Sequence, residues 1–281
     1  LPAAGLTIST TRLELPADVP ADTFSASDWN IAPEHPHWPL VWLTLVTQAA
    51  LGVSVTAAWS PDSTSHRIAA FVFAAAGMAG ALLHLGRPAM AWKALRNLRR
   101  SWLSREVALL SLYAAVAGLA VVVPAAAIVA AVAGTAGIFA SARLYVVPGR
   151  PAWNTPLTVV RFYATALALG PIVTGYRTLA VVGIVVALAA TVANWWRLSR
   201  SSDRAFVGSL RLDLDHFRSA TVTRFVVLAL ALAGLALGGP LAVAFLLVAG
   251  GELLGRWLFF VTVVPLNMPG SFWRGAAGGN R

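Results

Sequence analysis

The chain of 281 residues contains no cysteine and few charged residues. Without cysteine it cannot form disulfide bonds or supply thiolate ligands, so this chain by itself holds no thiolate metal site and no iron–sulfur cluster. Charged residues make up 11% of the chain and hydrophobic residues 58%, whereas soluble domains carry about 25% charged residues. This composition excludes an ordinary soluble domain and indicates a protein that crosses a membrane several times.

The few charges that are present are mostly basic, and the formal net charge is +10. Nucleic-acid binding is one interpretation of such a balance. In a membrane protein, however, an excess of Lys and Arg is typical of loops on the cytoplasmic side. We therefore interpret the charge as a signal of topology.

A membrane-spanning helix needs about 20 apolar residues. The third and fourth apolar runs are separated only by Pro124, and the last two only by residues 238–240, so both pairs are expected to form tight hairpins. The sequence predicts an all-α polytopic membrane protein with eight transmembrane helices in two four-helix bundles. Seven spans are the alternative, because a short connection can belong to a re-entrant segment. The eight runs are 38–59, 67–85, 104–123, 125–146, 157–175, 177–196, 222–238 and 241–264.

Residues 1–37 differ from the rest because they are polar, rich in proline and mostly acidic where they are charged. We expect a polar N-terminal arm that contacts a partner subunit, with the β-prone stretch 7–15 able to add to a partner as a strand. A solvated tail is the alternative. Residues 38–265 would form the eight-helix anchor domain and residues 266–281 a C-terminal tail.

The basic residues are distributed unevenly between the two membrane faces. Of the 21 Lys and Arg residues, only Arg67 and Arg177 fall on the face opposite the termini, if there are eight spans. Loops rich in Lys and Arg stay in the cytoplasm. We therefore predict a multi-pass protein of the cell's inner (plasma) membrane with both termini in the cytoplasm.

The connection between the second and third spans is strongly basic. Trp92, Leu95 and Leu98 recur every three residues, and Lys93, Arg96 and Arg99 recur beside them. This pattern predicts a short helix that lies in the membrane interface, where it binds lipid headgroups or docks a partner.

A histidine and a carboxylate flank this connection. His84 ends the second span and Glu106 begins the third, so both are expected at the same membrane face. Ionisable residues at membrane depth are costly and usually functional. His84 and Glu106 could bond the two hydroxyl groups of a quinol and accept its protons, while Arg87 and Arg105 assist. The structural alternatives are a hydrogen-bonding histidine, and a carboxylate in a first helical turn capped by Ser104.

Glu252 is the acid placed deepest in a predicted span, and Arg256 follows it by four residues. An ion pair within one helix is the structural interpretation, and a proton relay is the functional one. Gly251 and Gly255 flank Glu252 with the Gly-x-x-x-Gly spacing that permits close helix packing.

Two other functions fit the sequence less well. A b-type cytochrome needs axial ligands within its spans, and of the five histidines only His84 is near a span interior, so we expect no haem. A transporter usually has broken helices and polar groups at mid-membrane, whereas these spans are mostly rich in Ala and Val.

Four stretches carry a resemblance to a known family. They are HPHWPLVWLTLVTQAALG (35–52), LLHLGRPAMAWKALRNLRRSWLSRE (82–106), SARLYVVPGRPAWNTPLT (141–158) and GGELLGRWLFF (250–260). In this order they resemble the membrane-anchor subunit of dimethyl sulfoxide reductase, within the polysulfide-reductase and nitrite-reductase type quinone-linked anchors. The resemblance covers residues 35 to 262.

The resemblance implies a haem-free, eight-span subunit that anchors an iron–sulfur subunit and a molybdopterin catalytic subunit. Such a subunit oxidises menaquinol or ubiquinol, or reduces the quinone, without a metal of its own. The family's quinol-site histidine and glutamate fall on His84 and Glu106. Met90 replaces an arginine of the family pattern, and Arg87 could substitute for it. A structural anchor without a quinone site and a proton or ion translocator using Glu252 are the alternatives.

Overall fold

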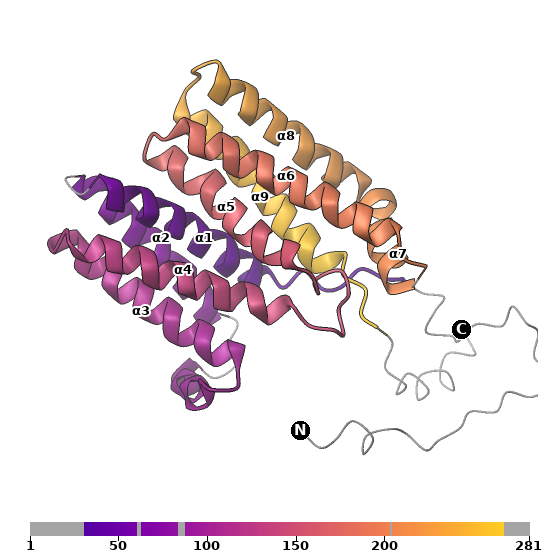
Figure 1. Ribbon diagram of the computed structural model, residues 1–281, viewed down its shortest axis with the longest axis horizontal. Helices are drawn as coiled ribbons and strands as arrows, with labels where there is room; N and C mark the ends of the chain where they lie inside the picture. The colour runs from indigo at the N-terminus through magenta and orange to yellow at the C-terminus, as the bar shows by residue number, and fades with distance from the viewer. Residues whose placement is uncertain (1–30, 61–62, 84–87, 203, 267–281) are drawn as a thin grey trace, which may run out of the picture. The chain divides into compact units, whose positions relative to one another are not determined.

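The computed structural model describes residues 31–60, 63–83, 88–202 and 204–266. Within these ranges the chain is helical and contains no strand (Figure 1). The long helices are α1 (Trp38–Trp59), α2 (Thr64–Leu83), α3 (Trp102–Val122), α4 (Ala126–Tyr145), α5 (Pro156–Val173), α6 (Arg177–Ser199), α8 (Arg218–Ala236) and α9 (Leu241–Val261). Shorter elements are the 3₁₀ helix η3 (Pro88–Asn97), α7 (Arg204–Arg211) and the π-helical turn η4 (Leu212–His216).

The prediction of a helical membrane protein is confirmed. Seven of the helices in the described ranges are long and apolar enough to cross a membrane, namely all the long ones except α2. Helix α2 overlaps the predicted span 67–85 but is not one of these seven helices. The count of eight spans therefore stays a prediction. The sequence did not predict α7 and η4, which lie between α6 and α8.

Helix α1 is the centre of the packing. It is apolar all round and buried along most of its length, as expected of a helix enclosed by other helices. It packs against α2, α4, α5 and α9. Helices α1 to α4 pack together, and α5, α6, α8 and α9 form a second set of neighbours. Because α1 contacts both sets, the division into two four-helix bundles stays a prediction.

The contact between α1 and α5 is close enough to involve the backbones. A Cβ atom on Gly52 would collide with the carbonyl group of Ala166, and one on Gly170 would collide with the backbone of Gly52 and Val53. Small residues allow such an approach between membrane helices. The two glycines therefore set the distance between α1 and α5.

The two predicted tight hairpins are present. Helix α3 ends at Val122 and α4 begins at Ala126, while α8 ends at Ala236 and α9 begins at Leu241. Gly238 has a φ of 76°, a left-handed conformation that glycine adopts without steric cost.

The helix ends define two faces of the described body. We call the face with residues 31–37, 88–101, 146–155, 200–217 and 262–266 the basic face, and the other the opposite face. On the basic face, Glu34 forms an ion pair of 3.1 Å with Arg150, and its amide donates to the Val261 carbonyl. Most of the predicted N-terminal arm and the C-terminal tail lie outside the described residues.

Three arginines that the sequence assigned to the basic face lie elsewhere, and one of them is Arg161, which lies within α5 beside the other two. Arg224 and Arg256 are buried within α8 and α9, and their exposed fractions are 3% and 4%. The assignment was wrong because apolar length alone does not fix where a span meets the membrane surface. Without these residues, the basic face still carries far more Lys and Arg than the opposite face.

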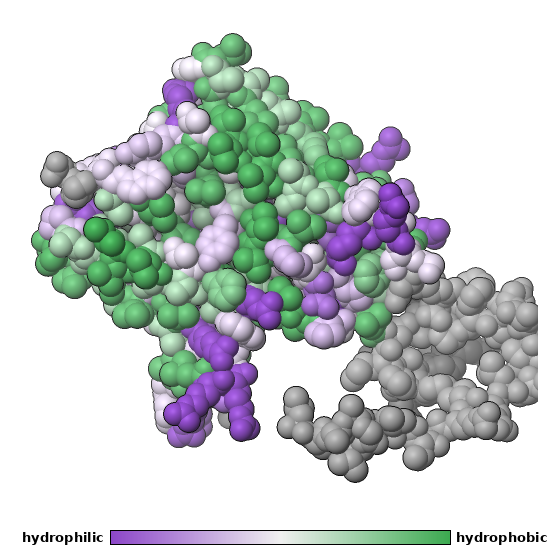
Figure 2. Space-filling model, viewed as in Figure 1, coloured by the Kyte–Doolittle hydropathy of each residue, from purple (hydrophilic) through white to green (hydrophobic). Residues whose placement is uncertain are grey.

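The basic connection between α2 and α3 forms η3, as the sequence predicted a short helix there. Trp92, Leu95 and Leu98 are exposed, and the Arg96 guanidinium lies 4.8 Å from the centre of the Trp92 ring. Figure 2 shows hydrophilic residues gathered over this projecting part of the described body. Its role in lipid or partner binding stays a prediction.

Replacing Gly170 with alanine tests the close contact of α1 and α5. The added Cβ would push the two backbones apart, and overpacking of this kind costs about 1–3 kcal/mol. We expect G170A to lower the midpoint of thermal unfolding of the purified protein. Gly234→Ala is the matched control, because a Cβ there has no neighbour within 4 Å. Equal stability of the two variants would contradict the contact.

The predicted sidedness can be tested with single cysteines, because the chain has none of its own. Ser199→Cys lies at the basic end of α6, and Ala125→Cys lies in an exposed turn on the opposite face. A membrane-impermeant maleimide added to intact cells is expected to label A125C, and to label S199C only after permeabilisation. The reverse pattern would place the basic face outside the cell.

Candidate functional site

Only part of the predicted quinone site falls within the described residues. His84 and Arg87 lie outside them, and so does the pocket expected between His84 and Glu106. Glu106 and Arg105 are described, both near the start of α3.

Glu106 is a buried carboxylate. Its exposed fraction is 6%, and the polar side chain beside it is Ser141 of α4. Helix α3 begins at Trp102, and its N-cap is Ser101, whose hydroxyl accepts from the Ser104 amide at 3.3 Å. The expectation that Ser104 caps the helix was therefore wrong. Because Glu106 lies beyond the first helical turn, capping does not account for its position.

Arg105 is held by the loop that leads into α3. Its guanidinium donates to the carbonyl oxygens of Leu98 and Arg99 at 2.9 and 2.7 Å. It also lies 4.4 Å from the centre of the Trp102 ring, and Arg143 lies 5.4 Å from the same ring. These contacts fix the path of the chain from η3 into α3, immediately before Glu106.

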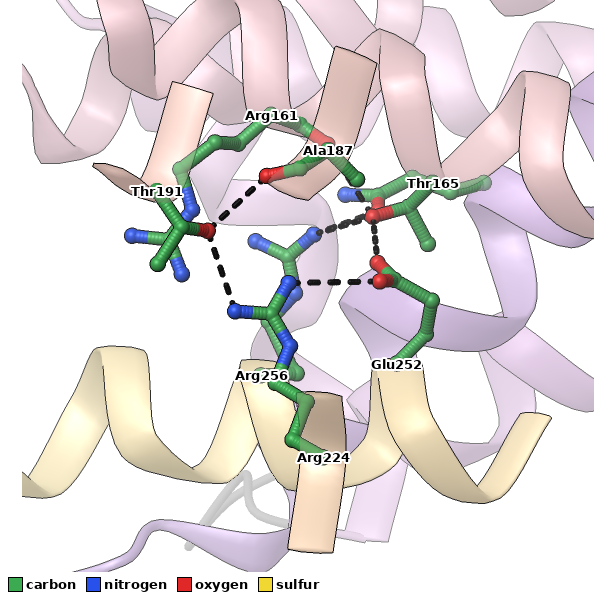
Figure 3. Close-up of polar contacts among 8 residues, drawn as sticks. Arg161, Thr165, Ala187, Thr191, Arg224, Glu252 and Arg256 are labelled. Carbon is green, nitrogen blue, oxygen red and sulfur yellow. Dashed lines mark hydrogen bonds and ion pairs between the residues drawn. The ribbon is translucent and has the colours of Figure 1, made fainter. Parts of the chain in front are cut away.

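A second polar site lies between the helices, around Glu252. Glu252 has an exposed fraction of 3%. Its Oε1 is 3.3 Å from the Arg224 Nη2 of α8, and its Oε2 accepts from the Thr165 hydroxyl of α5 at 2.5 Å. Arg224 also donates to the Thr191 hydroxyl of α6 at 3.0 Å. Figure 3 shows these side chains converging from four helices.

Arg256 belongs to the same site but does not pair with Glu252. It donates to the Gln48 side-chain oxygen at 2.6 Å and to the Thr165 hydroxyl at 3.4 Å. Its guanidinium lies 4.1 Å from the centre of the Phe162 ring. The predicted ion pair within one helix was therefore wrong, because Arg224 of α8 reaches Glu252 instead.

The predicted Gly-x-x-x-Gly contact explains how Arg224 fits there. A Cβ on Gly251 would lie 2.7 Å from the Leu228 side chain, and one on Gly255 would collide with the Arg224 guanidinium. The missing Cβ atoms thus let α8 pack against α9 with Arg224 between the helices.

The residues around Glu252 form what we call the arginine cluster: Gln48, Arg161, Thr165, Thr191, Arg224, Glu252 and Arg256. It encloses a cavity of about 10 Å³ lined by Arg161, Arg224, Arg256 and Glu252 among others. Three guanidinium groups beside one carboxylate can bind water or an anion, or assist proton movement. The sequence identified only Glu252 and Arg256 as candidates. Gln48, Thr165 and Thr191 were detectable as polar residues in the middle of apolar runs.

An apolar groove of about 710 Å³ opens between α1, α4 and α5. Its lining runs from Trp59 and Ile128 to Phe139 and Tyr163 and contains no carboxylate, histidine or basic side chain. The groove fits an alkyl or isoprenoid chain better than a group that must exchange protons. Within the described ranges, no three His, Asp or Glu residues are grouped so that they could hold a metal ion.

Comparison with known proteins identifies the family. Residues 33–261 match the model of the DMSO reductase anchor subunit (DmsC). The chain is 26% identical over 273 residues to the anaerobic dimethyl sulfoxide reductase chain YnfH of Escherichia coli (strain K12), covering 79% of this chain and 93% of that relative.

A second relative is named for a different activity. The chain is 30% identical over 179 residues to a sulfite dehydrogenase subunit of Allochromatium vinosum, covering 50% of this chain and 54% of that relative. The family model covers most of the chain, including all the long helices from α1 to α9. This chain is therefore a member of the DMSO reductase anchor subunit family.

Proposed function

We propose that the protein anchors a molybdopterin and iron–sulfur oxidoreductase in the membrane and exchanges electrons between quinone and that complex. Membership of the anchor family supports the anchoring role. The main observation in support of a quinone site is the burial of Glu106, a carboxylate close to the basic face with Ser141 beside it.

Quinol oxidation releases two electrons and two protons. In this proposal one quinol hydroxyl gives its proton to the Glu106 carboxylate, and the other hydroxyl bonds to His84 and gives its proton to the imidazole. Arg105 keeps the approach to α3 in place, and Arg87 assists at the head group. The electrons pass to the clusters of an iron–sulfur partner, and from there to the molybdopterin subunit.

The direction of electron flow follows from the catalytic partner. One relative is named for a reductase and the other for a dehydrogenase. A reductase partner would draw electrons from quinol, while a dehydrogenase partner would deliver them to quinone. The same carboxylate serves both directions, because it accepts a proton in one and returns it in the other.

Replacing the candidate carboxylate tests this function in the assembled complex. Glu106→Gln keeps the size and hydrogen-bonding capacity of the side chain but cannot accept the quinol proton. We expect E106Q, and also His84→Ala, to abolish quinol-dependent reduction of the partner's iron–sulfur clusters. Reduction of those clusters by dithionite would remain normal, because it does not use the quinone site.

Glu34→Gln is the matched control for charge removal on the basic face, because Glu34 pairs with Arg150 outside the long helices. It is expected to keep quinol-dependent reduction if the complex still copurifies. Unchanged rates in both E106Q and H84A, with all subunits present, would favour the structural-anchor alternative.

A further inference from the structure

A second small cavity lies between the arginine cluster and the basic face. Its volume is about 20 Å³, and its lining includes Arg161 and Arg224, which also line the cavity beside Glu252. On the side of the basic face, the lining includes Asn194, Ser209 and Asp213. The side chains of Arg161 and Arg224 therefore stand between the two cavities and face both.

The outer end of this connection is built by hydrogen bonds. Asp213 of η4 accepts from the Trp195 indole of α6 at 2.5 Å and from the Thr221 hydroxyl of α8 at 3.2 Å. Ser209 of α7 accepts from the Val264 amide at 2.9 Å. Polar groups of α6, α7, η4 and α8 thus surround the cavity where it approaches the basic face.

The inner end has donors that no described residue satisfies. The Nε atoms of Arg224 and Arg256 and the Nε2 atom of Gln48 are buried and have no hydrogen-bond partner within the described ranges. Buried polar groups in proteins are nearly always paired with protein atoms or ordered water. A cavity of about 10–15 Å³ with polar partners is enough for one water molecule, which matches both cavities.

Beyond the arginine cluster, towards the opposite face, the neighbouring residues are apolar. One helical turn further on in that direction, Thr165 is followed by Leu169, Arg224 by Leu228 and Glu252 by Val248. All three of these apolar side chains have exposed fractions of 2% or less and belong to one hydrophobic cluster. On α5, α8 and α9 the packing next to the cluster is therefore apolar on this side, and buried threonines recur only further on, at Thr56 and Thr174.

We propose that the two cavities hold water and form a one-sided path by which water and its protons reach Glu252 from the basic face. A water molecule at the carboxylate can give it a proton and regain one from the next water along the path, so no redox partner is needed. The charges facing Glu252 on this path are Arg161, Arg224 and Arg256, with Asp213 at the outer end. This inference does not depend on the quinone site.

The path can be tested by radiolytic labelling of the full chain in lipid nanodiscs. Short X-ray pulses generate hydroxyl radicals from water beside buried side chains, and mixing with heavy-oxygen water shows which of these waters exchange. We expect exchangeable label at Arg224, Arg256 and Glu252 and none at Leu228. A cluster that carries no label would be dry, and that would overturn the proposal.

A cavity-filling variant tests where the water enters. Ala152 lines the outer cavity and has an exposed fraction of 8%, so Ala152→Leu fills the space without removing a polar group. We expect A152L to lose the label at Arg256. Ala126→Leu is the matched control, since Ala126 is equally exposed but lies next to the turn on the opposite face. Ala152→Val serves if the leucine variant does not fold.

Label that persists at Arg256 in the folded A152L and A152V variants would overturn entry from the basic face, and so would its loss in A126L.

Infrared spectroscopy tests whether protons reach Glu252. After a step in pH, a carboxyl band that Glu252→Gln removes is expected to change quickly in the wild type and slowly in A152L. The absence of any such band at all pH values would overturn proton exchange at Glu252.

Discussion

The backbone contact of α1 with α5 is the constraint on which the rest of the arrangement depends. Gly52 lies one helical turn after Gln48, and Gly170 lies little more than one turn after Thr165, so the close approach places these polar side chains in reach of the same guanidinium. A wider separation would remove Arg256 from Gln48 or from Thr165. The packing of the glycines and the polar bonding of the arginine cluster therefore support each other.

The charges of the arginine cluster are costly to bury within a membrane. Removing one partner of a buried ion pair costs about 3–5 kcal/mol, because the remaining charge has lost its compensation. Here Glu252 alone bonds to Arg224 at ion-pair distance, while Arg256 has neutral partners and the faces of aromatic rings. Positive charge thus exceeds negative charge among the buried residues. Water from the basic face would solvate this excess, which gives the one-sided path a structural purpose as well as a chemical one.

The sequence predicted the elements better than the contacts between them. Apolar length and turn residues located the long helices and both hairpins, because each depends on residues close together in the chain. The partner of Glu252 could not be predicted in this way. Spacing within α9 suggested Arg256, whereas Arg224 comes from another helix and reaches Glu252 only because Gly255 leaves room. The same limit explains the misplaced depth of Arg224, since hydropathy does not reveal which polar residues face one another inside a bundle.

Glu106 and Glu252 occupy different environments on the same side of the molecule. An aromatic group lies near both: Tyr145 of α4 and Phe259 of α9, whose rings are 5.4 Å apart, and Phe162 of α5, on which Arg256 stacks. The Tyr145 phenol lies within electrostatic range of both Glu106 and Arg256, so this aromatic group links the two polar sites.

The position of Glu106 near the basic face decides whether a quinone reaction there would move charge across the membrane. In our proposals, protons from the quinol leave at the basic face, and water reaches Glu252 from the basic face as well. Towards the opposite face, the next turns of α5, α8 and α9 beyond the arginine cluster carry buried apolar side chains. With the iron–sulfur partner on the basic face, electrons would leave the membrane on the side where the protons are released. Quinol oxidation would then move no net charge across the membrane, whichever face is cytoplasmic.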